Sequence, residues 1–179
     1  MKEIFEALQF AADKHKYQKR KGTPGIPYIN HPIDVAALLL QTMDTPDKEL
    51  IIASLLHDTL EDTITKPDEI KVKFGRKVLE LVEEVTDDMN LSAAERKNQQ
   101  ILKASTLSFG ARCLKIADKT CNIRDILFTR IKWMRFRKIA YIRWACQVVS
   151  GIRSTHKGLE ESFDAIVKKS EELLDTKFL

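Results

Sequence analysis

Glycine and proline occur in this chain where helices would be expected to begin or end. The 179 residues hold six glycines and five prolines, and the stretches between them carry apolar residues at three- and four-residue spacing, as amphipathic helices do. No stretch alternates polar and apolar residues with comparable strength, so strands are not expected. The chain is therefore predicted to be all-α, a single compact domain of about eight to ten helices that spans residues 1–179.

Residues typical of helix caps indicate where several of these helices begin. Asn30 is expected to cap the second helix with Pro32 in its first turn, and Ser92 with Glu95 has the spacing of a capping box. The residues between the first and second helices are rich in glycine, proline and basic side chains, which predicts a loop. The predicted helices run to about His15, from Asn30 to about Met43, from Pro46 to Leu60, from Thr65 to Gly75, from Arg76 to about Thr86, from Ser92, from Gly110, from about Lys132 to Val149, and from Leu159 to Leu174.

Composition narrows the class of protein. Apolar residues make up 44% and charged residues 31%, and 30 basic against 26 acidic side chains give a net charge of +4. That charge is too small to require a nucleic-acid partner, and the longest strongly apolar run, Val35 to Leu40, is too short to cross a bilayer. The three cysteines cannot all pair with one another, and the N-terminal residues do not resemble a signal peptide. A cytoplasmic protein without a nucleic-acid or membrane partner is expected.

The segment IIASLLHDTLED carries the strongest chemical signal. On a continuous helix, His57, Asp58, Glu61 and Asp62 would fall within an arc of about 140° while apolar residues occupy the remainder. Like charges at this spacing repel one another, a cost that a purely structural helix has no reason to carry. A divalent cation would remove it, although a solvent-facing acidic stripe is the plainer alternative.

Two further elements favour the metal interpretation. His31 stands in Tyr-Ile-Asn-His-Pro at the start of a helix, and Asp118 is followed one turn later by Asn122. Alone, each could be a packing or surface residue. Together with the His57–Asp58 pair they provide two imidazoles and two carboxylates from separate helices, a set suited to Mn²⁺, Fe or Zn²⁺.

These segments occur in a familiar order. The series FAADKHKYQKRKGTPGIPYINHP, LLHDTLEDT, LVEEVTDD, LKIADKTCNIRDI and YIRWACQVV covers most of the chain. In this it resembles the HD superfamily of metal-dependent phosphohydrolases, and more narrowly the hydrolase domain of RelA/SpoT proteins and their small stand-alone alarmone hydrolases, such as the metazoan SpoT homologues. The resemblance implies a single helical HD domain.

The resemblance also implies roles for the acidic and imidazole side chains. Glu61 and Asp62 match the acidic pair of the HDxxED segment, and they would orient the attacking water and shuttle its proton. The family's ion is expected to be Mn²⁺, one per site. The implied metal ligands are His31, His57, Asp58 and Asp118.

Substrate contacts are implied by the same comparison. Arg20 would stack on a purine and Lys21 would meet phosphate, while Gly22 stands where relatives often carry a side chain that can contact the nucleotide. Arg137 and Tyr141 match residues that hold the distal phosphates in the stand-alone enzymes. The implied substrate-binding residues are Arg20, Lys21, Tyr28, Asn122, Arg137 and Tyr141.

The family reaction cleaves the 3′ ester bond of (p)ppGpp and releases pyrophosphate with GDP or GTP. The same centre could instead serve NADPH, by removing its 2′-phosphate, or (p)ppApp. A non-catalytic binding module is the third alternative, because basic residues crowd around Trp133 and Trp144. The partner is thus expected to be a small nucleotide, and a homo-oligomer stays open. His15 is predicted to be an ordinary surface or packing residue, and Cys121 a packed thiol.

Overall fold

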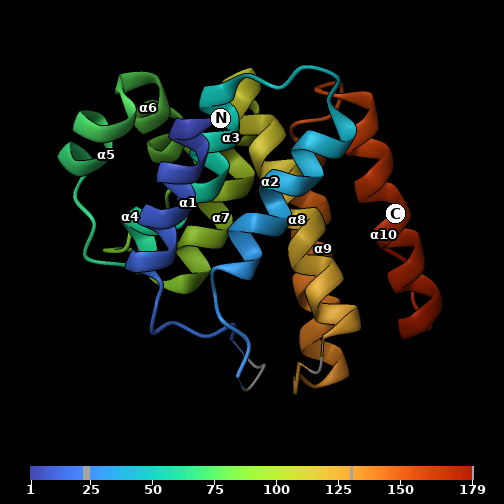
Figure 1. The fold of residues 1–179 in the computed structure, drawn as a ribbon. Coiled ribbons are helices and arrows are strands. Elements are labelled where there is room, and N and C mark those ends of the chain that lie inside the picture. Colours follow the sequence, from blue (N-terminus) through green and yellow to red (C-terminus); the bar gives the residue numbers. More distant parts are fainter. Residues whose placement is uncertain (22–24, 130, 179) are drawn as a thin grey trace.

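The computed structural model of the chain describes residues 1–21, 25–129 and 131–178 and consists of helices joined by short loops (Figure 1). Within these ranges there is no strand, and a single antiparallel bridge joins Lys19 to Pro27. No helix there is long and apolar enough to span a membrane. The predicted all-α class is confirmed. The elements are α1 (Lys2–Lys14), α2 (Asn30–Thr42), α3 (Lys48–Leu56), α4 (Thr59–Asp62), α5 (Pro67–Phe74), α6 (Arg76–Val85), α7 (Ala93–Lys103), the 3₁₀ turn η1 (Ala104–Thr106), α8 (Phe109–Phe128), α9 (Arg135–Ser150) and α10 (Lys157–Leu174).

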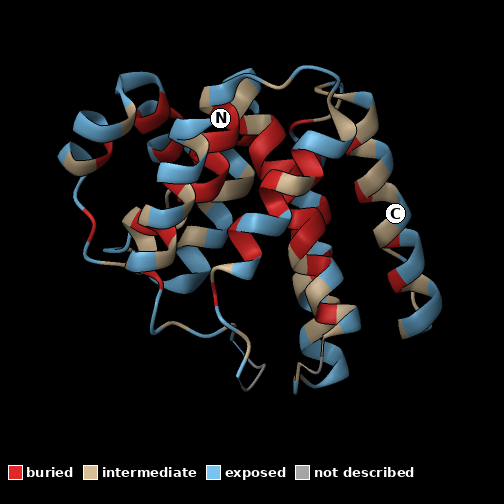
Figure 2. Ribbon diagram, in the orientation of Figure 1, coloured by how far each residue is buried: buried red, intermediate tan, exposed pale blue. Residues whose placement is uncertain are grey.

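Helices α3 and α8 form the centre of the molecule. Every residue of α3 from Leu50 to Leu56 is buried, and α8 carries buried residues along most of its length. Helix α2 packs on both, α1 and α6 pack on α3, and α10 packs on α8. Figure 2 shows the buried residues concentrated on these inner helices. Of the site side chains described below, Asp118 comes from α8 and His57 directly follows α3, so core packing sets the positions of these two.

The outer helices follow the apolar periodicity of the sequence. In α6 the buried residues Val78, Val82 and Val85 recur at three- and four-residue spacing, and in α1 Ala7 and Ala11 do the same. Such a stripe can be buried on only one side of a helix, which leaves the opposite face to solvent. Each of these helices therefore turns its buried stripe toward the core.

Several predicted boundaries are confirmed and others are wrong. Ser92 accepts from the Glu95 backbone amide at 3.3 Å, and the Glu95 side chain accepts from the Ser92 amide at 2.8 Å, which completes the capping box. Asn30 does not cap α2: it is the first helical residue, and the preceding residue already has helical backbone angles. Helix α8 begins before Gly110, because the Ser108 side chain caps it, and α9 begins at Arg135 and not near Lys132.

The predicted continuous helix through Leu60 is also wrong. Helix α3 ends at Leu56, and a turn at His57 and Asp58 separates it from α4. The His57 Nδ1 lies 2.7 Å from the Ser54 carbonyl oxygen, and the Thr59 hydroxyl donates to the Leu56 carbonyl at 2.6 Å. These side-chain hydrogen bonds to backbone carbonyls lie at the point where the helix ends. The arc calculated for an unbroken helix therefore does not apply.

Candidate metal centre and active-site cavity

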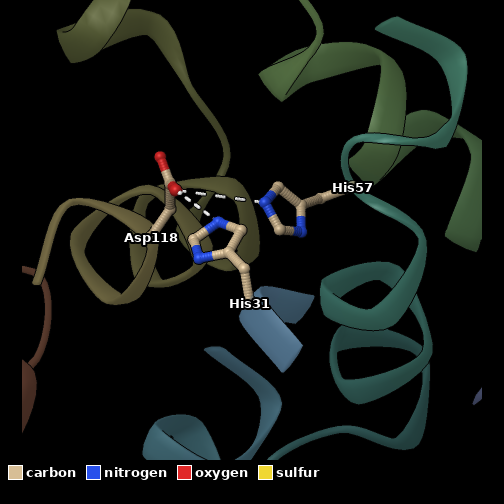
Figure 3. A group of neighbouring side chains, drawn as sticks. All are labelled: His31, His57 and Asp118. Atoms are coloured by element: carbon tan, nitrogen blue, oxygen red, sulfur yellow. Dashed lines mark hydrogen bonds and ion pairs between the residues drawn. The ribbon is translucent and has the colours of Figure 1, made fainter. Parts of the chain in front are cut away.

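Three buried side chains from distant parts of the chain converge at one point (Figure 3). His31 comes from the first turn of α2, His57 from the turn after α3, and Asp118 from the middle of α8. One ligand atom from each lies within 4.8 Å of the others. The Asp118 Oδ1 is 3.2 Å from the His31 Nε2 and 3.9 Å from the His57 Nε2. Two imidazoles and a carboxylate at this spacing could share one cation.

Asp58, the fourth predicted ligand, lies at the edge of this cluster. Its Oδ2 is 3.0 Å from the His57 Nε2 and 3.7 Å from the His31 Nε2. The same oxygen accepts a hydrogen bond of 2.5 Å from the Tyr28 hydroxyl. All four side chains predicted as ligands are thus brought together, and Tyr28 holds one of them in place.

The orientation of His57 provides a test of whether the cluster suits a metal. Its Nδ1–H donates to the Ser54 carbonyl, which leaves the lone pair of a neutral ring on Nε2. That Nε2 is buried and lies 3.0 Å from the Asp58 Oδ2. A neutral imidazole nitrogen and a carboxylate oxygen both present lone pairs, so this contact is unfavourable unless a proton or a cation lies between them. The donor set therefore fits a divalent cation.

The carboxylates of the cluster favour their charged forms. Burial alone would raise the pKa of Asp118, but Lys119, His31 and His57 outweigh it and hold that pKa well below its usual value. Asp58 behaves in the same way, because protonated His57 offsets the effect of burial and lowers the pKa of Asp58. Burial alone would lower the pKa of His57, but Asp58 and Asp118 outweigh it and raise that pKa to about 9, so that a proton occupies its Nε2 when no cation does. Two ionised carboxylates at a buried point create a negative potential that attracts a cation.

Glu61 has a different environment from these ligands. Its Oε2 accepts from the backbone amide of Asp87 at 3.2 Å. Burial, followed by the charges of Asp58 and Asp87, raises the pKa of Glu61 to about 7. A carboxyl group with such a pKa can take up and release a proton at neutral pH, as a general acid or base must.

Asp62 is held by a residue that the sequence did not single out. Its Oδ2 accepts from the Gln18 side-chain amide at 2.9 Å. Gln18 and Asp87 therefore position the acidic pair from outside the HDxxED segment. Both lie in segments quoted for the family resemblance, but nothing in the local pattern distinguishes them from neighbouring polar residues.

The metal cluster and the acidic pair line one cavity. Of the twelve predicted site residues, all but Arg137 are among its lining side chains. Arg137 instead lies against the ring of Trp133, with 4.2 Å from its guanidinium carbon to the ring centre, and Trp133 lines the cavity. Gly22 lies outside the described residues. Further lining residues that the sequence did not predict include Asp87, Arg96, Lys97, Gln100, Lys115 and Lys119.

The far wall of the cavity is aromatic and basic. The rings of Trp133, Tyr141 and Trp144 pack edge to face or tilted, with centres 6.0 Å and 5.2 Å apart along the series. Lys97 lies 5.2 Å from the centre of the Trp144 ring, and burial, Arg137 and Lys119 lower the pKa of Lys97. Among the described residues, no carboxylate forms an ion pair with Lys97 or Arg137. An anionic group of a ligand would relieve this repulsion between cations.

Arg20 is fixed in the cavity by hydrogen bonds. Its Nε and Nη2 donate to one oxygen of Asp125 at 2.9 Å and 2.6 Å, and Nη2 also donates to the Asn122 side-chain oxygen at 2.7 Å. The guanidinium lies over the Tyr28 ring, 5.4 Å from its centre. A planar group held this firmly is suited to stacking on a flat ligand.

Comparison with known proteins decides the family. The model of the HD domain family matches residues 7–136, which is more than half of the chain. The chain belongs to the HD-domain family.

Other HD-domain proteins resemble this one along nearly its whole length. The guanosine-3′,5′-bis(diphosphate) 3′-pyrophosphohydrolases MESH1 of Mus musculus and Homo sapiens are each 45% identical to it, over 93% of this chain and 94% of theirs. A solved structure described as a metazoan orthologue of SpoT that hydrolyses ppGpp superimposes with a TM-score of 0.89 at 38% identity, covering 93% of this chain and 94% of that one. The predicted resemblance to small stand-alone alarmone hydrolases is confirmed.

Proposed function

We propose that this HD-domain protein is a metal-dependent hydrolase that removes the 3′-pyrophosphate of (p)ppGpp and leaves GDP or GTP. The observation that carries the proposal is the meeting of the His31, His57 and Asp118 cluster with a carboxyl pair in one cavity. Relatives named for this reaction share 45% of their residues with the chain over 93% of its length. The cavity has the cationic and aromatic lining that a phosphorylated nucleotide requires.

In this proposal His31, His57, Asp58 and Asp118 hold one Mn²⁺ ion. Mixed imidazole and carboxylate donors suit Mn²⁺, although they would also accept Fe or Zn²⁺. When bound, the ion lowers the pKa of a water molecule and neutralises charge on the phosphate. Tyr28 keeps Asp58 directed at the cluster through its 2.5 Å hydrogen bond.

Glu61 is proposed to accept the proton of the attacking water. Its pKa of about 7 places it near the pH at which a general base works best. Asp62, held at a fixed angle by Gln18, is proposed to orient the water and pass the proton onward. In this proposal Glu61 takes the proton from the water, and Asp62 orients the water and transfers the proton onward.

The nucleotide is proposed to lie between Arg20 and the aromatic wall. Arg20 would stack on the purine, and Lys21, Tyr28 and Asn122 would contact the ribose and neighbouring phosphate. At the aromatic wall, Tyr141 lines the cavity and lies 6.0 Å from Lys97, measured from the ring centre to the Lys97 Nζ. Arg137 packs against the ring of Trp133, which lines the same wall. These residues would hold the phosphates remote from the metal.

We further propose that the protein works in the cytoplasm on a nucleotide and without a nucleic-acid or membrane partner. Its three cysteines are free and buried in the described part of the chain, as suits a reducing compartment. Every proposed site residue comes from a single chain, so the proposed activity does not depend on whether the protein forms a homo-oligomer.

The test is pyrophosphate release from ppGpp by the purified protein with Mn²⁺. Chelation by EDTA and the variant His57→Ala should both abolish release, and Glu61→Gln should lower kcat roughly 100-fold or more while Mn²⁺ still binds. His156→Ala serves as the matched control, since this imidazole caps α10 outside the cavity. Turnover of NADPH or ppApp without turnover of ppGpp would keep the metal centre and refute the proposed substrate.

A further inference from the structure

His15 is a buried imidazole outside the metal cluster. It follows the last residue of α1, only 2% of its surface is exposed, and its ring packs against Tyr28 with 4.9 Å between centres. The sequence predicts a surface or packing residue here. The packing is confirmed, but one nitrogen of the ring has a specific partner: Nδ1 lies 2.6 Å from the side-chain oxygen of Gln18.

Gln18 joins His15 to the acidic pair. Its Nε2 donates to the Asp62 Oδ2 at 2.9 Å while its Oε1 faces His15. An ionised carboxylate can only accept, so the amide must present its NH₂ group to Asp62. The amide oxygen then faces His15, and His15 must donate from Nδ1. The position of one proton on His15 therefore determines which way the Gln18 amide points.

The backbone keeps Gln18 from moving away. Its amide donates to the His15 carbonyl at 2.9 Å, and its carbonyl accepts from the Tyr28 amide at 3.0 Å. The backbone of Gln18 is thus fixed, and its side chain is held by the contacts of its amide with His15 and Asp62. With its proton on Nδ1, His15 matches the amide orientation that presents the NH₂ group to Asp62.

The cost of burying His15 indicates that the hydrogen bond matters. Its Nε2 is buried and has no partner among the described residues. An unsatisfied buried polar atom costs about 1–3 kcal/mol, which a phenylalanine stacked on Tyr28 would avoid. A role in packing alone therefore does not account for an imidazole at this position.

We propose that His15 and Gln18 are positioning residues that hold the Asp62 carboxylate at the angle needed for proton transfer. This inference rests on the proposed function, because it assigns a purpose to the orientation of Asp62. Neither residue touches the substrate or the metal ligands in this account. Because His15 also packs on Tyr28, its loss can disturb KM and Mn²⁺ affinity, and the positioning role predicts that kcat falls by a larger factor than either of them changes.

A pair of His15 variants tests the inference. In His15→Asn the side-chain amide nitrogen falls near the position of Nδ1, whereas in His15→Gln it falls near that of Nε2. Both variants bury one amide, so a merely structural role predicts similar losses. We expect His15→Asn to keep kcat within about threefold and His15→Gln to lower it roughly 10- to 100-fold, as loss of an orienting partner does. Equal kcat values at equal stability would overturn the proposal.

A double-mutant cycle tests whether Gln18 affects kcat through Asp62. Gln18→Met keeps the length of the side chain and removes its amide, and it should lower kcat roughly 10-fold or more in the wild-type background. In an Asp62→Asn background the same change should have no further effect on kcat. Ser170→Ala is the control, because it removes a buried hydroxyl from α10 far along the chain. If Gln18→Met lowered kcat by the same factor in the Asp62→Asn background as in the wild type, the positioning role would be refuted.

Imidazole ¹⁵N NMR of the protein loaded with diamagnetic Zn²⁺ in place of paramagnetic Mn²⁺ separates this inference from the proposed function, since it needs no substrate. His15 should show the Nδ1–H tautomer, and Gln18→Met should change it. The Nε2–H tautomer in the wild type would overturn the inference even if ppGpp is cleaved. Failure to cleave ppGpp together with the Nδ1–H tautomer would instead refute the substrate and retain the hydrogen-bonded pair.

Discussion

At Glu61, burial and two neighbouring carboxylates act in the same direction. They raise the pKa of this side chain from 4.5 to about 7, so the folded protein binds the proton more tightly than the unfolded chain. Ionising Glu61 therefore weakens the fold. The stability that protonation provides is fully present below pH 4.5 and is lost as the pH rises toward 7. The property that makes Glu61 a suitable base thus has a cost in stability.

This cost can be measured in EDTA-treated protein. Glu61→Gln should be more stable than the wild type at pH 8 by about 1–2 kcal/mol, because glutamine cannot ionise next to Asp58 and Asp87. The difference should shrink toward zero near pH 5, where the wild-type carboxyl is protonated. Urea denaturation across this range measures it. A variant less stable than the wild type at pH 8 would contradict the raised pKa.

Arg20 gives a prediction about substrate binding. Arg20→Ala should raise KM several-fold with a smaller change in kcat, since the stacking group is lost. Asp125→Asn should raise KM less, because the guanidinium keeps its contact with Asn122 but loses the ion pair at 2.6 Å. Initial rates against ppGpp measure both effects. An unchanged KM for Arg20→Ala would end the stacking proposal.

At the scale of one element, the break between α3 and α4 was not predicted, because the spacing of apolar residues carries no information about polar side chains that bond the backbone. Apolar spacing predicted that a buried helix carries His57, and it does end there. The pattern could not reveal that Thr59 and His57 form hydrogen bonds to backbone carbonyls at the point where the helix ends. Those bonds involve polar side chains, which periodicity treats only as gaps between apolar positions. The turn then aims Asp58 in a direction that a helix would not.

Removing one of these bonds should loosen the metal site. Thr59→Val keeps the shape of the side chain but leaves the buried Leu56 carbonyl without its 2.6 Å partner. We expect a loss of about 1 kcal/mol of stability and weaker Mn²⁺ binding. Thr106→Val is the control, because it removes a similar bond of 2.8 Å at an exposed position. Equal Mn²⁺ affinity in Thr59→Val and the wild type would show that the turn does not orient the ligands.

At the scale of the whole molecule, the ligand cluster joins α2, the turn after α3, and α8. A cation held by all three should stabilise the native state by mass action, by about 2.7 kcal/mol at a concentration 100 times its Kd. Adding Mn²⁺ to EDTA-treated protein should therefore raise Tm, and His31→Ala should abolish the increase. Differential scanning calorimetry tests this. An increase in Tm that survives in His31→Ala would place the ion elsewhere.

Much of the site could be predicted from sequence because its ligands lie in recognisable segments. The four proposed ligands and the proposed acidic pair were predicted in this way, and the fold brings these side chains into one cavity. Gln18 and Lys97 were missed, since each acquires its role only through contact with another element. Arg137 was predicted to bind the distal phosphates, and in the structure it packs on Trp133 and is not among the lining side chains. Side-chain contacts between distant helices are what a single sequence reveals least.

The sequence distance between the ligands has a consequence for how the protein matures. His31 and Asp118 stand 87 positions apart, so only a long stretch of the newly made chain contains the complete set of proposed ligands. A growing chain on the ribosome cannot capture the ion until α8 has emerged and docked on α2. Metal insertion is therefore a late event in biogenesis, and the cell acquires hydrolytic capacity only from chains that have already completed their core.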